Sequence, residues 1–107
     1  MKKDEFNGIL KEMIKEEMQC LTVKNEEYTV GSEDSLNNFK SVAEEVGITP
    51  IKAWYVFFNK HIRSIANYIK TGSEKSNEPI EERIMDARNY LVFLRALIQE
   101  SKKENNG

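Results

Sequence analysis

The sequence predicts an all-α protein: a four-helix single domain with two long antiparallel C-terminal helices, assembled as a homo-oligomer. Apolar residues recur three and four positions apart along most of the chain, which is the spacing of one helix face. We find no convincing strand pattern. The length of 107 residues fits one domain, and 39% hydrophobic with 32% charged residues is typical of a soluble globular protein.

The first half of the chain predicts two helices separated by a polar loop. The first helix spans about residues 4–24, and its apolar residues are Phe6, Ile9, Leu10, Met13, Ile14 and Leu21. The segment KNEEYTVGSED that follows is polar and contains a glycine, so it indicates a loop. The second helix is predicted over about residues 32–46, with Ser32 as its N-cap and Gly47 as its stop.

The second half predicts the two long helices. Thr49 and Pro50 are typical of an N-cap and a first helical position, so the third helix is predicted over about residues 50–71. The fourth is predicted over about residues 79–101, with 102–107 as a frayed tail. Its apolar stripe repeats every seven residues and comprises Ile80, Ile84, Ala87, Leu91, Leu94 and Ile98. The short polar turn between the two helices predicts antiparallel packing.

These two helices carry more apolar surface than one neighbouring helix can cover. More than half the circumference of the third helix is apolar, including Ile51, Trp54, Tyr55, Phe57, Phe58, Ile62, Ile65, Tyr68 and Ile69. We expect the first two helices to cover part of this surface. The remainder indicates a homodimer or a higher oligomer.

Charge and composition exclude several functional classes. The chain has 16 basic and 18 acidic residues, a balance that argues against a duplex nucleic-acid binder. No apolar run approaches the roughly 20 residues of a membrane span, and the N-terminus lacks the apolar core of a signal peptide. A cytoplasmic protein is the expectation, in the host cytoplasm if a phage encodes it. One histidine and one cysteine leave no nucleophilic triad or Cys/His metal cluster, so no catalytic residue is predicted.

Polar residues of the third helix form the first candidate site. His61 projects onto the aromatic face, either as a hydrogen-bonded core histidine or as a ligand contact. Lys60 and Arg63 lie on the flank of that face, about one turn apart. They are either an ordinary solvated surface or a phosphate site, in which the arginine supplies a bidentate fork.

Asp86 on the fourth helix is the second candidate. It precedes Tyr90, Phe93 and Leu97 on one line of the helix, where the pattern calls for an apolar residue. A buried carboxylate needs a partner, so we expect an ion pair with the third helix, a ligand hydroxyl or a metal. Glu82, one turn earlier, makes a pair that Mg²⁺ accepts when water completes its shell.

Three segments, KNEEY, NKHIRSIANYIKTG and EPIEERIMDARNYLVFLRALI, carry a family resemblance. Over about residues 24–98 the chain resembles small helical phage and prophage proteins of the nucleotide-modification-associated group. More distantly, it is similar to the MazG-like all-α nucleoside-triphosphate pyrophosphohydrolases. The resemblance implies a nucleotide pocket lined by Lys24, Tyr28, Lys60, Arg63, Glu82, Asp86 and Tyr90.

The hydrolase pattern is incomplete in this chain. Those enzymes hold Mg²⁺ with a Glu-Glu-x-x-Glu set that faces a Glu-x-x-Asp set. Here Cys20 follows Glu16 and Glu17 where the third acid is expected, and Arg83 stands three residues before Asp86. A site that lacks these carboxylates binds Mg²⁺ weakly, so we expect binding rather than hydrolysis.

Three functions therefore follow from the sequence. The first is a phage-type protein that binds a phosphorylated or cyclic nucleotide, or another phosphorylated small molecule, and sequesters it without a cofactor. The second is a Mg²⁺-dependent nucleoside-triphosphate pyrophosphohydrolase, with Glu12, Glu16, Glu82 and Asp86 as ligands. The third is a helical inhibitor or adaptor that binds another protein through the surplus apolar surface.

Overall fold

The computed structural model describes residues 1–28, 34–74 and 78–106, and these form four α-helices. The helices are α1 (Lys3–Tyr28), α2 (Asn37–Val46), α3 (Pro50–Thr71) and α4 (Ile80–Asn106). No strand occurs in the described ranges, so the all-α, four-helix prediction is confirmed. The antiparallel course of the two long helices and the homo-oligomer stay predictions.

The ends of α3 follow the predicted signals. The Oγ1 atom of Thr49 accepts the Lys52 backbone N–H at 3.3 Å, and Pro50 occupies the first helical position. Gly72 ends the helix with φ of 65°, in the left-handed region that favours glycine. Gly47 ends α2 in the same way, with φ of 74°.

The start of α2 differs from the prediction. The Asp34 Oδ1 atom accepts the Leu36 backbone N–H at 2.9 Å. This side-chain turn satisfies a backbone donor without helix, so α2 begins at Asn37. Ser32, the predicted N-cap, lies outside the described residues.

The helices α1 and α4 are longer than predicted. The first continues to Tyr28 and the last to Asn106. The added segments, NEEY and KKENN, lack apolar spacing, which is why the pattern ended before them. Both contain glutamate or lysine, which are good helix formers, and Lys103 in the last turn of α4 complements the helix dipole.

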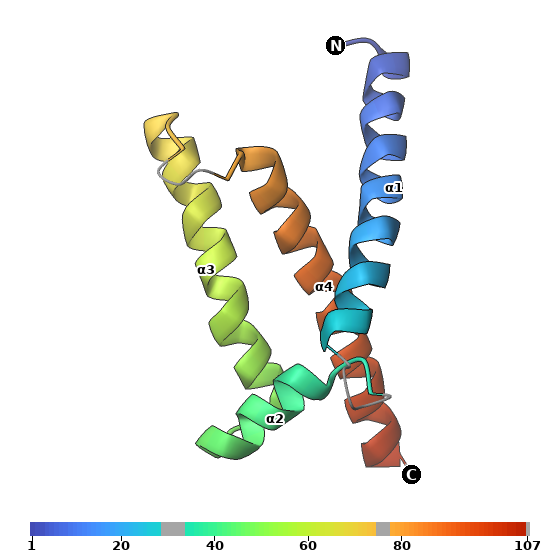
Figure 1. Ribbon diagram of the computed structural model, residues 1–107, viewed down its shortest axis with the longest axis vertical. Coiled ribbons are helices and arrows are strands. Elements are labelled where there is room, and N and C mark those ends of the chain that lie inside the picture. Colours follow the sequence, from blue (N-terminus) through green and yellow to red (C-terminus); the bar gives the residue numbers. More distant parts are fainter. Residues whose placement is uncertain (29–33, 75–77, 107) are drawn as a thin grey trace.

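The core lies at one end of the molecule. Five buried side chains form it: Leu36, Phe39, Trp54, Phe93 and Leu97. They come from α2 and its N-cap residue Leu36, the start of α3 and the second half of α4, which meet in the lower part of Figure 1. The Phe39 ring contacts Phe57, Tyr90 and Phe93 with centroids 5.5–6.2 Å apart.

Away from this core the helices differ in how they are packed. Figure 1 shows the end of α3 and the start of α4 together at the upper end of the molecule. The first half of α1 lies apart from the other helices, whereas its second half approaches α4. The molecule is elongated, with extents of 48, 29 and 27 Å.

Candidate functional site

The seam between α3 and α4 contains several of the polar residues singled out in the sequence. The Trp54 indole N–H donates to the Tyr90 carbonyl oxygen at 2.6 Å. The His61 ring lies 4.6 Å from the Tyr90 ring, with 42° between their planes. Both His61 and Tyr90 are half-buried, so this part of the seam is a packed aromatic and polar contact between two helices.

Asp86 is half-buried on α4, one turn before Tyr90, as its place on the apolar stripe predicts. Lys60 and Arg63, by contrast, are exposed on α3, and Glu82 is exposed on α4. Of the predicted ligand residues, Arg63 lines a cavity that Lys60, Asp86 and Tyr90 do not line.

That cavity has a volume of about 300 Å³ and lies at the turn between α3 and α4. It is lined by Arg63, Ser64, Asn67, Tyr68, Ser73, Glu74, Glu78, Ile80 and Arg83. The Ile80 backbone N–H at the start of α4 donates to Glu74 Oε1 at 2.9 Å, and Arg83 Nε lies 3.2 Å from Glu78 Oε2. The Glu74 and Glu78 carboxylates therefore already contact the Ile80 backbone N–H and the Arg83 guanidinium of this site.

The structure gives less information on the other predicted binding residues, Lys24 and Tyr28, and on the predicted metal site. Lys24 and Tyr28 belong to the last turns of α1, and their side chains lie outside the described part of the structure. Within the described residues, no group of three or more His, Cys, Asp or Glu side chains could hold a metal ion. The pair Glu82 and Asp86 therefore remains a two-carboxylate prediction.

A polar junction between α1 and α4 was missed by the sequence reasoning. The Arg88 Nε–H donates to Glu17 Oε2 at 2.7 Å, and Asn89 Nδ2 donates to Cys20 Sγ at 3.2 Å. Asn89 is 1% exposed, and its Oδ1 atom has no hydrogen-bond partner among the described residues. The signal available in the sequence was Glu17, which interrupts the apolar stripe of the first helix between Met13 and Leu21.

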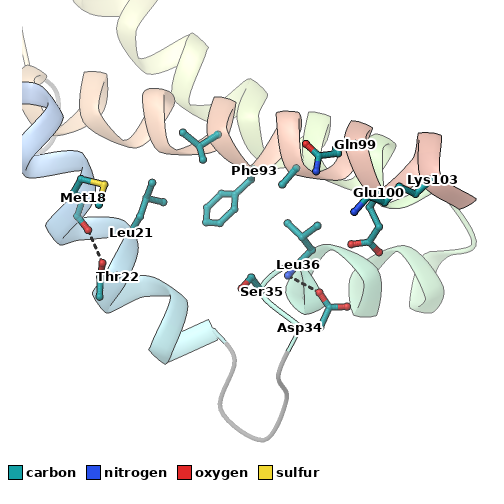
Figure 2. A pocket seen from close by; sticks show the side chains of 12 residues that line it. Met18, Leu21, Thr22, Asp34, Ser35, Leu36, Phe93, Gln99, Glu100 and Lys103 are labelled. Atoms are coloured by element: carbon teal, nitrogen blue, oxygen red, sulfur yellow. Dashed lines mark hydrogen bonds between the residues drawn. The ribbon is translucent and has the colours of Figure 1, made fainter.

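A larger open groove lies beside this junction, between α1, α4 and residues 34–36, which precede α2. Figure 2 shows it with Leu21, Leu36 and Phe93 facing its interior. Its volume is about 710 Å³, and its further lining residues are Met18, Thr22, Asp34, Ser35, Val92, Ala96, Gln99, Glu100 and Lys103. An apolar interior with a polar rim suits an apolar side chain or helix better than a nucleotide phosphate.

One end of the groove carries an ion-pair network. The Lys40 ammonium pairs with Asp34 and with Glu100, and so links α2 to the second half of α4. The hydrogen bond from Lys40 lowers the pKa of Asp34 below its usual value. The hydrogen bond to Asp34, followed by that to Glu100, raises the pKa of Lys40.

The most unusual feature of the molecule is its exposed apolar surface. In α1, Phe6 is 61% exposed, and Ile9, Leu10 and Ile14 are also exposed. Further exposed large apolar residues on α3 and α4 are Tyr55, Val56, Ile62, Ile69, Ile84, Leu91, Val92 and Ile98. A stable monomer rarely leaves contiguous apolar faces of this kind in water.

Comparison with protein-family models, with curated proteins and with solved structures finds no match in any of the three. The resemblance to phage nucleotide-modification proteins and to MazG-like hydrolases stays a prediction. Among the described residues, no helix is long and apolar enough to span a membrane. The function is therefore argued from the surfaces of this chain.

Proposed function

We propose that this chain is a helical protein-interaction module, which packs exposed apolar helix faces against a second helical surface. The observation that carries the proposal is the state of α1. Its stripe of Phe6, Ile9, Leu10 and Ile14 is exposed, although Leu21, further along the same stripe, packs against the core.

The physical reason concerns how helices are stabilised. Most helical stability in proteins comes from burying an apolar face against another element. The first half of α1 has such a face and leaves it in water, at a cost of about 25 cal/mol for each Å² of apolar surface. A binding partner that covers this stripe removes that cost, which makes the stripe a docking surface.

A binding assay with matched variants tests this proposal. The tagged chain is immobilised and offered cell lysate together with an untagged copy of itself. Retention of a protein, including the untagged copy, should be lost with Phe6→Glu and kept with Val46→Glu, because Val46 is an exposed apolar residue on α2, outside the stripe. Equal retention by all three chains, or by none, would contradict the proposal.

A second candidate function is binding of a phosphorylated ligand or nucleotide at the cavity of the α3–α4 turn. Arg63 and Arg83 both line it, and Tyr68 and Ser64 add a stacking surface and a hydroxyl. A phosphate could replace the Glu78 carboxylate at Arg83 and the Glu74 carboxylate at the Ile80 backbone N–H. Lys60, Asp86 and Tyr90 are then accessory residues on the same helix pair.

Calorimetry with a panel of mononucleotides and cyclic nucleotides tests this second function. Arg63→Ala should weaken binding about tenfold or more, the value of a hydrogen bond to a charged group. Lys52→Ala, an exposed charge at the other end of α3, should leave the affinity unchanged. Absence of binding across the panel would remove the nucleotide function.

The Mg²⁺-dependent hydrolase remains a variant of this second function. Glu82 and Asp86 would supply two carboxylates, and the substrate phosphates would complete the metal shell. Pyrophosphate release from nucleoside triphosphates should then need Mg²⁺ and should fall with Asp86→Asn. Release that survives this substitution would exclude Asp86 as a ligand.

A further inference from the structure

The helix α3 carries an apolar stripe that the fold leaves half uncovered. The stripe is Ile51, Tyr55, Phe58, Ile62, Ile65 and Ile69, spaced four and three residues in alternation. Every second member, namely Tyr55, Ile62 and Ile69, is exposed. Tyr55 directly follows Trp54 and Ile62 directly follows His61, and both of these preceding residues contact Tyr90 of α4.

The helix α4 repeats the arrangement. Ile84, Leu91 and Ile98 are exposed and lie seven residues apart, within the seven-residue repeat found in the sequence. Leu91 follows Tyr90, which contacts α3, and Ile98 follows the buried Leu97. A repeat of seven residues is the pattern by which helices pack along their length against partner helices.

The two stripes fall on one face of the helix pair. One residue step rotates about 100° around a helix axis, in the same sense for every α-helix. When two neighbouring helices run in opposite directions, equal rotations away from their contact lead to the same side. With α3 and α4 as the predicted antiparallel pair, these six exposed residues form one surface, which we call the open face.

The charges around the open face are mostly basic, although the exposed Glu81 also projects onto the outer flank of α4. Lys52 and Lys70 on α3 and Arg95 and Lys102 on α4 are exposed, and in helical projection they fall on its outer flanks. A second copy that presented the same face would bring like charges together. The partner that fits is an apolar helix with an acidic flank.

The first half of α1 has this composition. Its exposed apolar stripe is flanked on one side by Glu5, Glu12 and Glu16, all exposed. Each chain therefore carries one open face with basic flanks and one apolar helix with an acidic flank. Two copies related by a twofold axis can satisfy both surfaces in both chains.

We infer that the partner is a second copy of this chain, whose α1 stripe packs on the open face while its own open face receives the first copy's α1. This inference rests on the proposed interaction function and names its partner. It gives the apolar stripe of α1 and the open face of α3 and α4 one common role.

Sedimentation velocity and light scattering over a range of concentrations test the inference. The wild-type chain should be a dimer. Leu91→Glu and Phe6→Glu should weaken the dimer by about 30-fold or more, the loss typical of an interface hot spot. Both positions are exposed in the single chain, so circular dichroism should remain helical. Val46→Glu, on α2, should leave the dimer intact.

A charge swap tests the orientation. Glu12→Lys and Arg95→Glu should each weaken the dimer a few-fold, as exposed ion pairs do, and the double variant should regain affinity. Glu44→Lys, on α2, is the matched control. The inference would be overturned if the wild-type chain were a monomer at all concentrations, or if Leu91→Glu did not weaken the dimer. It would also be overturned if the double variant bound no more tightly than the single variants. If a monomer still captures another protein through Phe6, the proposed function stands and the inference alone fails.

Discussion

Two regions of this molecule use the same kinds of residue in opposite ways. At the end where α2 meets α3 and α4, Phe39 and Trp54 are 4% and 5% exposed. Along the first half of α1 and the open face, Phe6 and Tyr55 are both 61% exposed. Side chains of similar size and polarity are thus buried in one region and left in water in the other.

The difference shows where one chain buries its large apolar side chains and where it leaves them exposed. The short helix α2 brings Leu36 and Phe39 against both long helices, and this closes a core. In the other region α1 approaches α4 only through its second half, where Glu17, Cys20 and Leu21 make contact. In our proposal, the apolar stripes beyond that contact are surfaces for association between chains.

The largest difference in stability should be between substitutions of two adjacent residues, the buried Trp54 and the exposed Tyr55. Trp54→Ala should lower the free energy of unfolding by about 3–5 kcal/mol, because it leaves a cavity in the core and removes the hydrogen bond to the Tyr90 carbonyl oxygen. Tyr55→Ala should change it by less than about 0.5 kcal/mol in the dissociated chain. Urea unfolding at low protein concentration measures both. Similar losses would mean that the two regions do not differ in packing.

The α1–α4 junction should have the next largest effect. Glu17→Gln weakens the charge-assisted hydrogen bond from Arg88 and should cost about 1–3 kcal/mol. Lys15→Gln, at an exposed position on the side of α1 away from the apolar stripe, should cost little. Hydrogen exchange should report faster exchange along α1 in the Glu17 variant alone. Equal exchange in the two variants would show that Glu17 does not anchor α1.

Asn89 offers a smaller test of the same junction. Its Oδ1 atom is buried without a hydrogen-bond partner among the described residues, so Asn89→Leu should raise the free energy of unfolding by up to about 1 kcal/mol. Asn89→Asp should lower it, because a charge would be buried. Thermal unfolding of the three chains decides this. A loss with leucine would show that Oδ1 has a partner in the folded chain.

The ion-pair network around Lys40 should have the smallest effect and a distinct pH dependence. The pKa of Asp34 is lowered from 3.8, so its contribution is full above that pH and is lost as pH falls through the folded value. The pKa of Lys40 is raised from 10.5, so its contribution is full below that pH and is lost as pH rises through the folded value.

The Lys40→Met variant should therefore differ most from the wild type between pH 3.8 and 10.5. The difference should stay below about 1 kcal/mol, because these side chains are about one-third exposed. Lys103→Met, at the groove rim, is the control. Unfolding measured across pH checks the prediction, and a difference that does not change with pH would contradict it.

The sequence was most informative where local chemistry decides the structure. As predicted, α3 begins at Pro50, with Thr49 as its N-cap, and ends at Thr71, before Gly72. Helix capping and the left-handed conformation of a glycine depend on residues close in sequence, so a sequence pattern can predict them. The start of α2 was placed too early, because the turn made by the Asp34 side chain competes with helix. The half-buried position of Asp86 followed from its place on an apolar stripe.

The sequence was less informative about the candidate sites, which depend on how helices meet. Helical spacing placed Lys60 and Arg63 on one flank of α3, and both are exposed there. It could not show that Arg63 joins Arg83 at the turn, or that Arg88 reaches Glu17, 71 residues away. Such contacts are set by the packing of helices distant in sequence, which a pattern within one helix does not encode.

Hydrogen exchange of α1 at two protein concentrations tests the central claim most directly. If a second copy covers the apolar stripe of α1, the amides of residues 3–16 should exchange slowly at high concentration and quickly at low concentration. The Leu91→Glu variant should exchange quickly at both, because its open face no longer accepts the helix. Exchange that is independent of concentration in the wild type, or slow in this variant, would contradict the account.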